Sequence, residues 1–161
     1  MHTVYQASMA TPLGPLCITC NSQAITIIEF TDELTARNDD VPLLTQAKRE
    51  LQDYFSGSRT VFEFPVQPQG TEFQQRVWQA LRGIKHGQLA SYGEIAKRIG
   101  SPKGMRAVGM ANRNNPVAIV IPCHRVIGAN GTLTGYAGGL DKKAWLLELE
   151  GSANRLRQST S

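Results

Sequence analysis

The hydrophobic pattern of this chain of 161 residues changes at a proline-containing segment, residues 62–70. Before it, short apolar runs alternate with turn signals, which is typical of β-strands. After it, apolar residues recur at helical spacing behind residues that favour helix starts. The chain is therefore expected to fold as a small β-rich region followed by a mainly helical one.

The first region is expected to form a small antiparallel β-sheet with one helix across it. Turn residues at 11–15 and 21–23 separate strands that are expected at 3–9, 16–20 and 24–30. A helix is expected over 43–55, because Leu44, Ala47 and Leu51 recur at helical spacing and Gly57 provides a stop.

The second region carries two capping boxes. Thr71 with Gln74 and Ser91 with Glu94 predict two helix starts, and Gly100 predicts the end of the second of these helices. Proline is favoured at the first position of a helix, so Ser101-Pro102 predicts the start of another. Two short helices joined by a glycine form a candidate helix-turn-helix.

The rest of the second region is expected to hold a hairpin and a last helix. Asn130-Gly131 is a strong hairpin signal. Asp141 is expected to cap a helix in which Trp145, Leu146 and Leu149 pack inward. The predicted organisation is an N-terminal α/β domain (1–64), a linker (65–70), a helix-turn-helix or winged-helix-like domain (71–151) and a flexible tail (152–161).

The segment Ile121-Pro122-Cys123-His124-Arg125-Val126 follows an apolar run and is the main candidate for chemistry. A thiolate forms more readily beside cationic groups or at a helix start, and His124, Arg125 and a helical turn at Cys123 provide both. In a regular strand His124 would point away from the sulfur, so a water bridge or a helical turn is required. The alternative is a buried, inert cysteine in a tight turn.

Charge is divided unequally along the chain. Residues 1–69 hold four basic and eight acidic side chains, a net charge of −4, whereas residues 70–161 carry a net charge of +8. The second helix of the candidate helix-turn-helix is expected to hold Lys103, Arg106 and Arg113. A basic region of this kind favours binding to a polyanion such as DNA, and the alternative is a solvated basic surface on a packing unit.

Three cysteines and the lack of a signal peptide favour a reducing compartment. No apolar run is long enough to cross a membrane. The chain is therefore expected to be a cytoplasmic, prokaryotic protein. Cys17-Ile18-Thr19-Cys20 stands without a second ligand pair, so no metal site is expected there.

Four motifs in close order carry a resemblance to a known family. They are Gly104-Met105-Arg106-Ala107-Val108-Gly109, Asn115-Pro116-Val117, Ile121 to Val126, and Gly135-Tyr136-Ala137-Gly138-Gly139-Leu140. Over residues 70–151 this set resembles the O6-alkylguanine-DNA alkyltransferases, the methylated-DNA–protein-cysteine methyltransferases. The first region is consistent with the family's variable first domain.

The resemblance implies direct DNA repair, in which an alkyl group moves from O6 of guanine, or from O4 of thymine, to the protein's own cysteine. Cys123 would be the acceptor, and His124 and Glu150 would remove its proton through a water. Asn115 would brace the turn, and Tyr92 would donate a proton to the departing guanine. The thioether product is not regenerated, so no cofactor is expected.

The resemblance also implies duplex DNA containing alkylated guanine as the partner, bound in its minor groove by a protein expected to act as a monomer; cooperative binding along DNA stays open. Arg106 would fill the gap left by the flipped base, as wedging side chains do elsewhere. The other DNA-binding candidates are Ser91, Lys103, Ala107, Gly109 and Arg113. The base pocket would be formed by Tyr92, Val126, Tyr136, Ala137 and Gly138, with the carbonyls of Cys123 and Val126 facing the amino group of guanine.

Three other functions fit parts of the sequence. One is a non-catalytic protein that binds alkylated bases, against which the presence of Cys123 argues. Another is a helix-turn-helix regulator with an inert cysteine, although no additional regulatory domain is evident. The third is a cysteine hydrolase, which is disfavoured because no oxyanion-hole motif is evident.

Overall fold

A computed structural model describes residues 3–136 and 138–153 of the chain. They belong to two compact units. The first unit is Met1–Gln69 together with Pro116–Ala118, and the second is Gly70–Asn115 together with Ile119–Ser161. A short stretch of the second half of the sequence therefore belongs to the first unit, which the division predicted from the sequence did not include.

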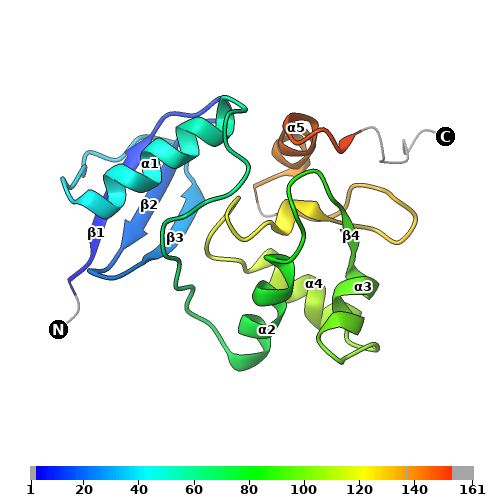
Figure 1. The fold of residues 1–161 in the computed structure, drawn as a ribbon. Helices are drawn as coiled ribbons and strands as arrows, with labels where there is room; N and C mark the ends of the chain where they lie inside the picture. Colours follow the sequence, from blue (N-terminus) through cyan, green and yellow to red (C-terminus); the bar gives the residue numbers. More distant parts are fainter. Residues whose placement is uncertain (1–2, 137, 154–161) are drawn as a thin grey trace. The chain divides into compact units, whose positions relative to one another are not determined.

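The first unit is an antiparallel sheet covered by a helix (Figure 1). Its strands are β1 (Tyr5–Met9), β2 (Leu16–Cys20) and β3 (Ile25–Phe30), and β2 is central, with Ile18 opposite both Ala7 and Ile28. All five residues of β2 are buried. The helix α1 (Pro42–Phe55) packs against all three strands. The predicted sheet and helix are confirmed.

The apolar spacing of α1 explains how it packs. Leu44, Ala47, Leu51 and Tyr54 are all buried, so one face of the helix covers the sheet. Pro42 occupies the start of the helix, where the missing N–H costs nothing. Gly57 has a φ of +85°, a left-handed conformation that glycine adopts without strain, and it ends the helix as predicted.

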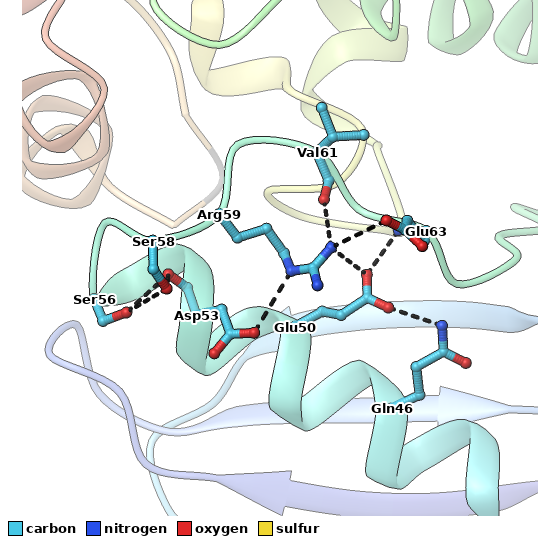
Figure 2. A network of polar contacts seen from close by, with 8 residues as sticks. All are labelled: Gln46, Glu50, Asp53, Ser56, Ser58, Arg59, Val61 and Glu63. Carbon is cyan, nitrogen blue, oxygen red and sulfur yellow. Dashed lines mark hydrogen bonds and ion pairs between the residues drawn. The ribbon is translucent and has the colours of Figure 1, made fainter.

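A buried carboxylate holds the segment after α1 against the helix (Figure 2). Glu50 is only 2% exposed and accepts hydrogen bonds from Gln46 Nε2 at 2.8 Å and from the backbone N–H of Glu63 at 2.7 Å. The Arg59 guanidinium lies 3.6 Å from Glu50 and 3.7 Å from Asp53. These contacts give the buried carboxylate partners and fix the chain that leaves α1.

Two extended segments lie beside β3. Ile25 exchanges backbone hydrogen bonds with Pro65 and Gln67, both at 2.8 Å. Ile28 donates to the Pro116 carbonyl at 2.9 Å and accepts from the N–H of Ala118 at 2.9 Å. This pairing accounts for the part of the apolar run 117–121 that belongs to the first unit.

The second unit is mainly helical (Figure 1). The contacting helices are α2 (Glu72–Leu81), α3 (Tyr92–Arg98) and α4 (Met105–Arg113), and the buried Trp78 of α2 donates to the Ala111 carbonyl at 2.8 Å. Both predicted capping boxes are present, at Thr71 and Ser91. The remaining elements are β4 (Ala90–Ser91), β5 (Val126–Ile127), α5 (Leu140–Leu149) and a 3₁₀ turn, η1 (Cys123–Arg125).

The second helix of the helix-turn-helix begins later than predicted. Gly100 has a φ of +74° and ends α3, as expected, but α4 begins at Met105 behind Gly104 and not at Ser101-Pro102. The N–H of Gly104 donates to the Ser101 carbonyl at 2.8 Å, which closes a turn over Pro102. Proline is favoured at the second position of such a turn as well as at the start of a helix. Here Pro102 occupies the second position of the turn, and the helix begins only at Met105.

Two expectations for the last part of the chain are wrong. Asn130-Gly131 lies in a turn that is closed by a hydrogen bond from the Gly128 N–H to the Thr132 carbonyl at 3.0 Å. However, β5 pairs with β4 in parallel, and no hairpin follows among the described residues. Gly139, with a φ of +100°, is the N-cap of α5, and Asp141 lies in its first turn without capping it.

The inward face of α5 also differs from the expectation. Leu146 is buried as predicted, but Trp145 and Leu149 are half-buried, and Leu147 and Lys143 are buried in their place. In the described parts of the chain, the structure contains no helix with the length and apolar character needed to span a membrane.

Candidate active site

Cys123 begins the 3₁₀ turn η1 and is buried, with 6% of its surface exposed. The turn follows Pro122, whose N–H is absent, and the chain folds back so that the Cys123 N–H donates to the Ile121 carbonyl at 2.8 Å. Asn115 braces this turn: its Nδ2 donates to the Ile121 carbonyl at 2.7 Å and lies 3.1 Å from the Cys123 sulfur. A helical turn at Cys123 was one of the two predicted solutions to the placement of His124.

His124, Arg125 and Glu150 form a buried polar cluster. His124 Nε2 lies 2.8 Å from Glu150 Oε2, and Arg125 binds the same carboxylate with two nitrogens, at 2.7 and 2.9 Å. Arg125 also donates to the Ile84 carbonyl at 2.6 Å. The structure thus brings Glu150 to His124, as predicted, and adds Arg125 as a second partner.

The charge states of this cluster follow from burial and hydrogen bonding. Burial alone would raise the pKa of Glu150, but hydrogen bonds from His124 and Arg125 outweigh it and hold that pKa far below its usual value. Burial lowers the pKa of His124 although Glu150 opposes the shift. The imidazole is therefore neutral at pH 7.

The Glu150 carboxylate determines the tautomer of the His124 imidazole. An ionised carboxylate only accepts hydrogen bonds, so His124 Nε2 carries the proton and Nδ1 is the basic nitrogen. His124 Nδ1 is buried and has no hydrogen-bond partner among the described residues. This nitrogen is free to accept a proton from a neighbouring acid.

The Cys123 thiolate is favoured by a cation that the sequence pattern did not indicate. Burial dominates and raises the pKa of Cys123 above its usual value, while the hydrogen bond from Asn115 and the charge of Lys143 offset part of this rise. His124 is neutral and Arg125 is paired with Glu150, so neither provides the positive charge that was expected beside the Cys123 thiolate. Lys143 lies 20 residues along the chain on α5, and only its place on a predicted helix face could have indicated it.

Lys143 is fully buried and ties together two segments around the site. Its Nζ donates to the Val126 carbonyl and, at 2.6 Å, to the Thr134 carbonyl. Burial lowers the pKa of Lys143 to about 8, and the nearby Cys123 opposes this shift. Near neutral pH most of this side chain remains charged.

Of the predicted base-pocket residues, Val126 lies in β5, Tyr136 and Gly138 lie in the loop that follows it, and Tyr92 contacts that loop. The Tyr92 hydroxyl lies 3.5 Å from the Thr134 carbonyl, and a side-chain carbon at Gly109 would stand 4.0 Å from the Tyr92 ring. Val126 is buried and Gly138 is half-buried. The Tyr136 hydroxyl is buried without a hydrogen-bond partner among the described residues, and burial raises the pKa of Tyr136 well above its usual value. Ala137 lies outside the described residues.

The predicted DNA-binding residues lie on and before α4 and at the start of α3. Arg106, Ala107 and Arg113 are exposed on α4, Lys103 is exposed just before it, and Gly109 and Ser91 are half-buried. Ser91 is also the N-cap of α3, directly before Tyr92. The same helix therefore exposes basic residues and, through Gly109, approaches Tyr92.

The predicted absence of a metal site stays an expectation. Cys17 and Cys20 are both buried in β2, and burial raises the pKa of each thiol. No group of three or more metal-ligating side chains occurs in residues 3–136 and 138–153.

The fold and site define a class of protein: a helix-turn-helix unit built around a buried cysteine with a neutral, carboxylate-bound histidine beside it. Comparison with known proteins makes this class specific. The family described as "6-O-methylguanine DNA methyltransferase, DNA binding domain" matches residues 72–152. Its companion "6-O-methylguanine DNA methyltransferase, ribonuclease-like domain" matches residues 4–68.

Individual relatives agree over nearly the whole length. A methylated-DNA–protein-cysteine methyltransferase of Methanosarcina acetivorans is 45% identical, covering 92% of this chain and 99% of its own. The protein of that name from Haemophilus influenzae is 43% identical, covering 93% and 88%. The structure of a Mycobacterium tuberculosis OGT in complex with DNA matches with a TM-score of 0.84 at 43% identity over 94% of each chain. The chain belongs to the methylated-DNA–protein-cysteine methyltransferase family.

Proposed function

We propose that this protein repairs alkylated DNA by moving an alkyl group from O6 of guanine, or O4 of thymine, to Cys123. The observation that supports Cys123 most directly is its setting: Asn115 contacts the sulfur, Lys143 provides positive charge, and the neighbouring His124 is a neutral base bound to Glu150. A thiolate is the nucleophile in such chemistry, and each of these groups favours its formation or accepts its proton.

The proposed reaction begins with proton removal. The Cys123 proton passes through one water to His124 Nδ1, and Glu150 stabilises the imidazolium that results. The sulfur then attacks the alkyl carbon, a carbon–sulfur bond forms, and the bond between that carbon and O6 breaks. The electron pair of the broken bond goes to the base, and Tyr92 donates a proton to the departing guanine. Tyr92 then regains a proton from solvent, and His124 returns to solvent the proton that it took from Cys123. A thioether remains, and the reaction ends after one turnover.

Access to O6 requires the nucleotide to leave the base stack. We propose that α4 binds the minor groove of the duplex and that Arg106 fills the space left by the base. The exposed positive charges of Lys103, Arg106 and Arg113 support binding to phosphates of any sequence. The solved structure of a Mycobacterium tuberculosis OGT in complex with DNA supports DNA as the partner. Small residues at Ala107 and Gly109 would allow the helix a close approach, and Ser91 would bind near the flipped base.

The proposed base pocket comprises Tyr92, Val126, Tyr136, Ala137 and Gly138. The carbonyls of Cys123 and Val126 would accept hydrogen bonds from the amino group of guanine. We further propose that the protein acts as a monomer in the cytoplasm. Its bacterial and archaeal relatives support a prokaryotic source. The domain limits proposed from the sequence are 1–64 for the supporting domain and 71–151 for the reacting one.

An intact mass measurement tests the proposal. After incubation with a duplex containing O6-methylguanine, the protein should gain one methyl group on the peptide that contains Cys123. Cys123→Ser should gain none, although it should still bind the duplex. A methyl group on Cys17 or Cys20, or an unmodified wild-type protein, would contradict the assignment.

A non-catalytic protein that binds alkylated bases would give a different result. It would bind the methylated duplex in preference to an unmethylated one and would keep its original mass. The contact between Asn115 and the Cys123 sulfur argues against this second candidate, because an inert thiol needs no such partner.

A further inference from the structure

Asn112 is a buried amide on the inner face of α4. It is only 3% exposed and shares that face with the apolar Val108 and Ala111. Its Oδ1 is buried and has no hydrogen-bond partner among the described residues. An amide that is only partly hydrogen-bonded is unfavourable in such a place, where an apolar side chain of similar size would pack without this cost. A stability cost of this kind points to a function.

The side-chain hydrogen bond of Asn112 leads to the candidate nucleophile. Its Nδ2 donates to the Cys123 carbonyl at 3.4 Å. The same carbonyl accepts the N–H of Val126, which closes the turn η1. A carbonyl oxygen has two lone pairs, so both are engaged within the protein.

The second carbonyl that faces the proposed base pocket is also engaged, because the Val126 oxygen accepts from Lys143 Nζ. Each of the two acceptors proposed to bind the guanine amino group therefore already accepts a hydrogen bond from a protein donor in the free protein. The bond from Asn112 is 3.4 Å long, which makes it a weak hydrogen bond that an incoming amino group would replace easily.

We propose that Asn112 broadens the substrate range of this site to alkylated bases that lack a 2-amino group, such as O4-alkylthymine. This inference rests on the proposed function of Cys123. When such a base enters the pocket, it offers no donor to the Cys123 carbonyl, and Asn112 keeps that carbonyl hydrogen-bonded. When guanine enters, its amino group competes with Asn112 for the same lone pair, so it gains less there than it would at a free carbonyl.

The direction of the effect follows from the cost of an unpaired acceptor. Without the Asn112 donor, a base lacking the amino group leaves one lone pair of a buried carbonyl empty, whereas guanine fills it. Sites built around an acceptor that only the correct substrate satisfies reject analogues that lack the donor. An apolar residue at position 112 should therefore make the protein more selective for guanine.

The test compares three duplexes of the same sequence that contain O6-methylguanine, O6-methylhypoxanthine or O4-methylthymine. O6-methylhypoxanthine differs from O6-methylguanine only in lacking the 2-amino group. For Asn112→Leu, the rate constant on O6-methylguanine divided by that on O6-methylhypoxanthine should rise about tenfold over the wild-type ratio, which corresponds to ~1.4 kcal/mol. The ratio of O6-methylguanine to O4-methylthymine should rise in the same direction.

Two further variants make the result specific. Val108→Ala disturbs the same buried face without touching the Cys123 carbonyl, and it should leave both ratios unchanged. Asn112→Ala removes the donor with a smaller side chain, and it provides the test if Asn112→Leu does not fold. Ratios that stay within about twofold of wild type, or that fall, would overturn the inference, since a purely structural loss lowers all three rates together. A wild-type protein that takes no methyl group from any duplex would instead refute the proposed function.

Discussion

Lys143 is the residue whose charge most directly favours the Cys123 thiolate. Replacing it with methionine removes that charge, so the pKa of the Cys123 thiol should rise. If this shift amounts to about one pKa unit, the rate of methyl transfer near pH 7 should fall about tenfold, because one unit corresponds to a tenfold change in thiolate. The pH dependence of the transfer rate checks this, and the rising limb of the profile should move to higher pH.

Lys142 provides the matched control, because it is the adjacent lysine on α5 but is absent from the groups that shift the Cys123 pKa. Lys142→Met should keep the wild-type profile. A Lys143→Met protein that is slower at every pH by the same factor would show a structural role only, through the two carbonyls that the lysine binds.

Glu150 should be a major source of stability as well as a partner of His124. Its pKa is depressed in the folded protein, so it stabilises the fold above its unfolded pKa of about 4.3, and this contribution is lost as the pH falls. Glu150→Gln leaves Arg125 buried without its ionised partner, which costs about 3–5 kcal/mol. Urea unfolding at several pH values should show the largest difference from wild type near neutral pH and a smaller one below about pH 4.

An equal loss of stability at all pH values would contradict this assignment of charge. The conservative Glu150→Asp keeps the carboxylate on a shorter side chain. It should therefore recover part of the pH dependence even if it does not recover the full stability.

Among single residues, the resemblance identified several members of the site. Residues that reach the site from distant parts of the sequence were not predicted. The structure brings together Cys123, Asn115, His124 and Glu150, all of which the resemblance indicated. Arg125, Lys143 and Asn112 were not assigned these contacts, because no local pattern tells which carboxylate or carbonyl a distant side chain will reach. Burial also reversed one expectation, since it makes His124 neutral and leaves the cationic part to Lys143.

Helix starts were predictable where a side chain provides a specific bond. At Thr71 and Ser91 the hydroxyl accepts from the backbone N–H three residues on, and this contact depends only on neighbouring residues. The starts of α4 and α5 follow Gly104 and Gly139 without any side-chain cap. Their positions depend on how the preceding loops close, which local sequence alone does not determine.

The exposed face of α4 should matter for repair of duplex DNA but not for the reaction with a free base. Arg106→Ala should slow methyl transfer from a duplex by about tenfold or more, because unstacking a base costs a few kcal/mol and the variant no longer fills the gap. Its reaction with free O6-methylguanine, which needs no flipping, should be close to wild type. Single-turnover rates on the two substrates check this.

Arg98→Ala is the control for charge alone, since Arg98 is also exposed but lies at the end of α3. It should affect duplex repair much less. An Arg106→Ala protein that loses the same factor on both substrates would contradict the proposed role of Arg106.

A substitution within the first unit should lower the stability of the protein without changing its methyl-transfer rate. Glu50 belongs to the first unit and makes its contacts there (Figure 2). Glu50→Ala leaves the Arg59 guanidinium and the Glu63 N–H without this partner, which should lower the free energy of unfolding by about 1–3 kcal/mol. The methyl-transfer rate of the protein that remains folded should not change, and a changed rate would show that this network also supports the site.

The unequal division of charge between the two regions makes DNA binding sensitive to salt. The region from residue 70 onward carries a net charge of +8, and Lys103, Arg106 and Arg113 are exposed together around α4. If each of the three neutralises one phosphate, the logarithm of the binding constant should fall with the logarithm of salt concentration with a slope of about −2.7. Fluorescence anisotropy with an unmodified duplex measures this slope.

Replacing one of these residues, for example Lys103→Ala, should reduce that slope by about one phosphate's share without changing sequence preference. The reaction with a free alkylated base involves no phosphate and should be nearly independent of salt. A duplex-binding slope close to zero would mean that positive charge on the second region does not drive DNA binding. The basic surface would then be only a solvated one, and α4 would have to hold the duplex through contacts other than ion pairs.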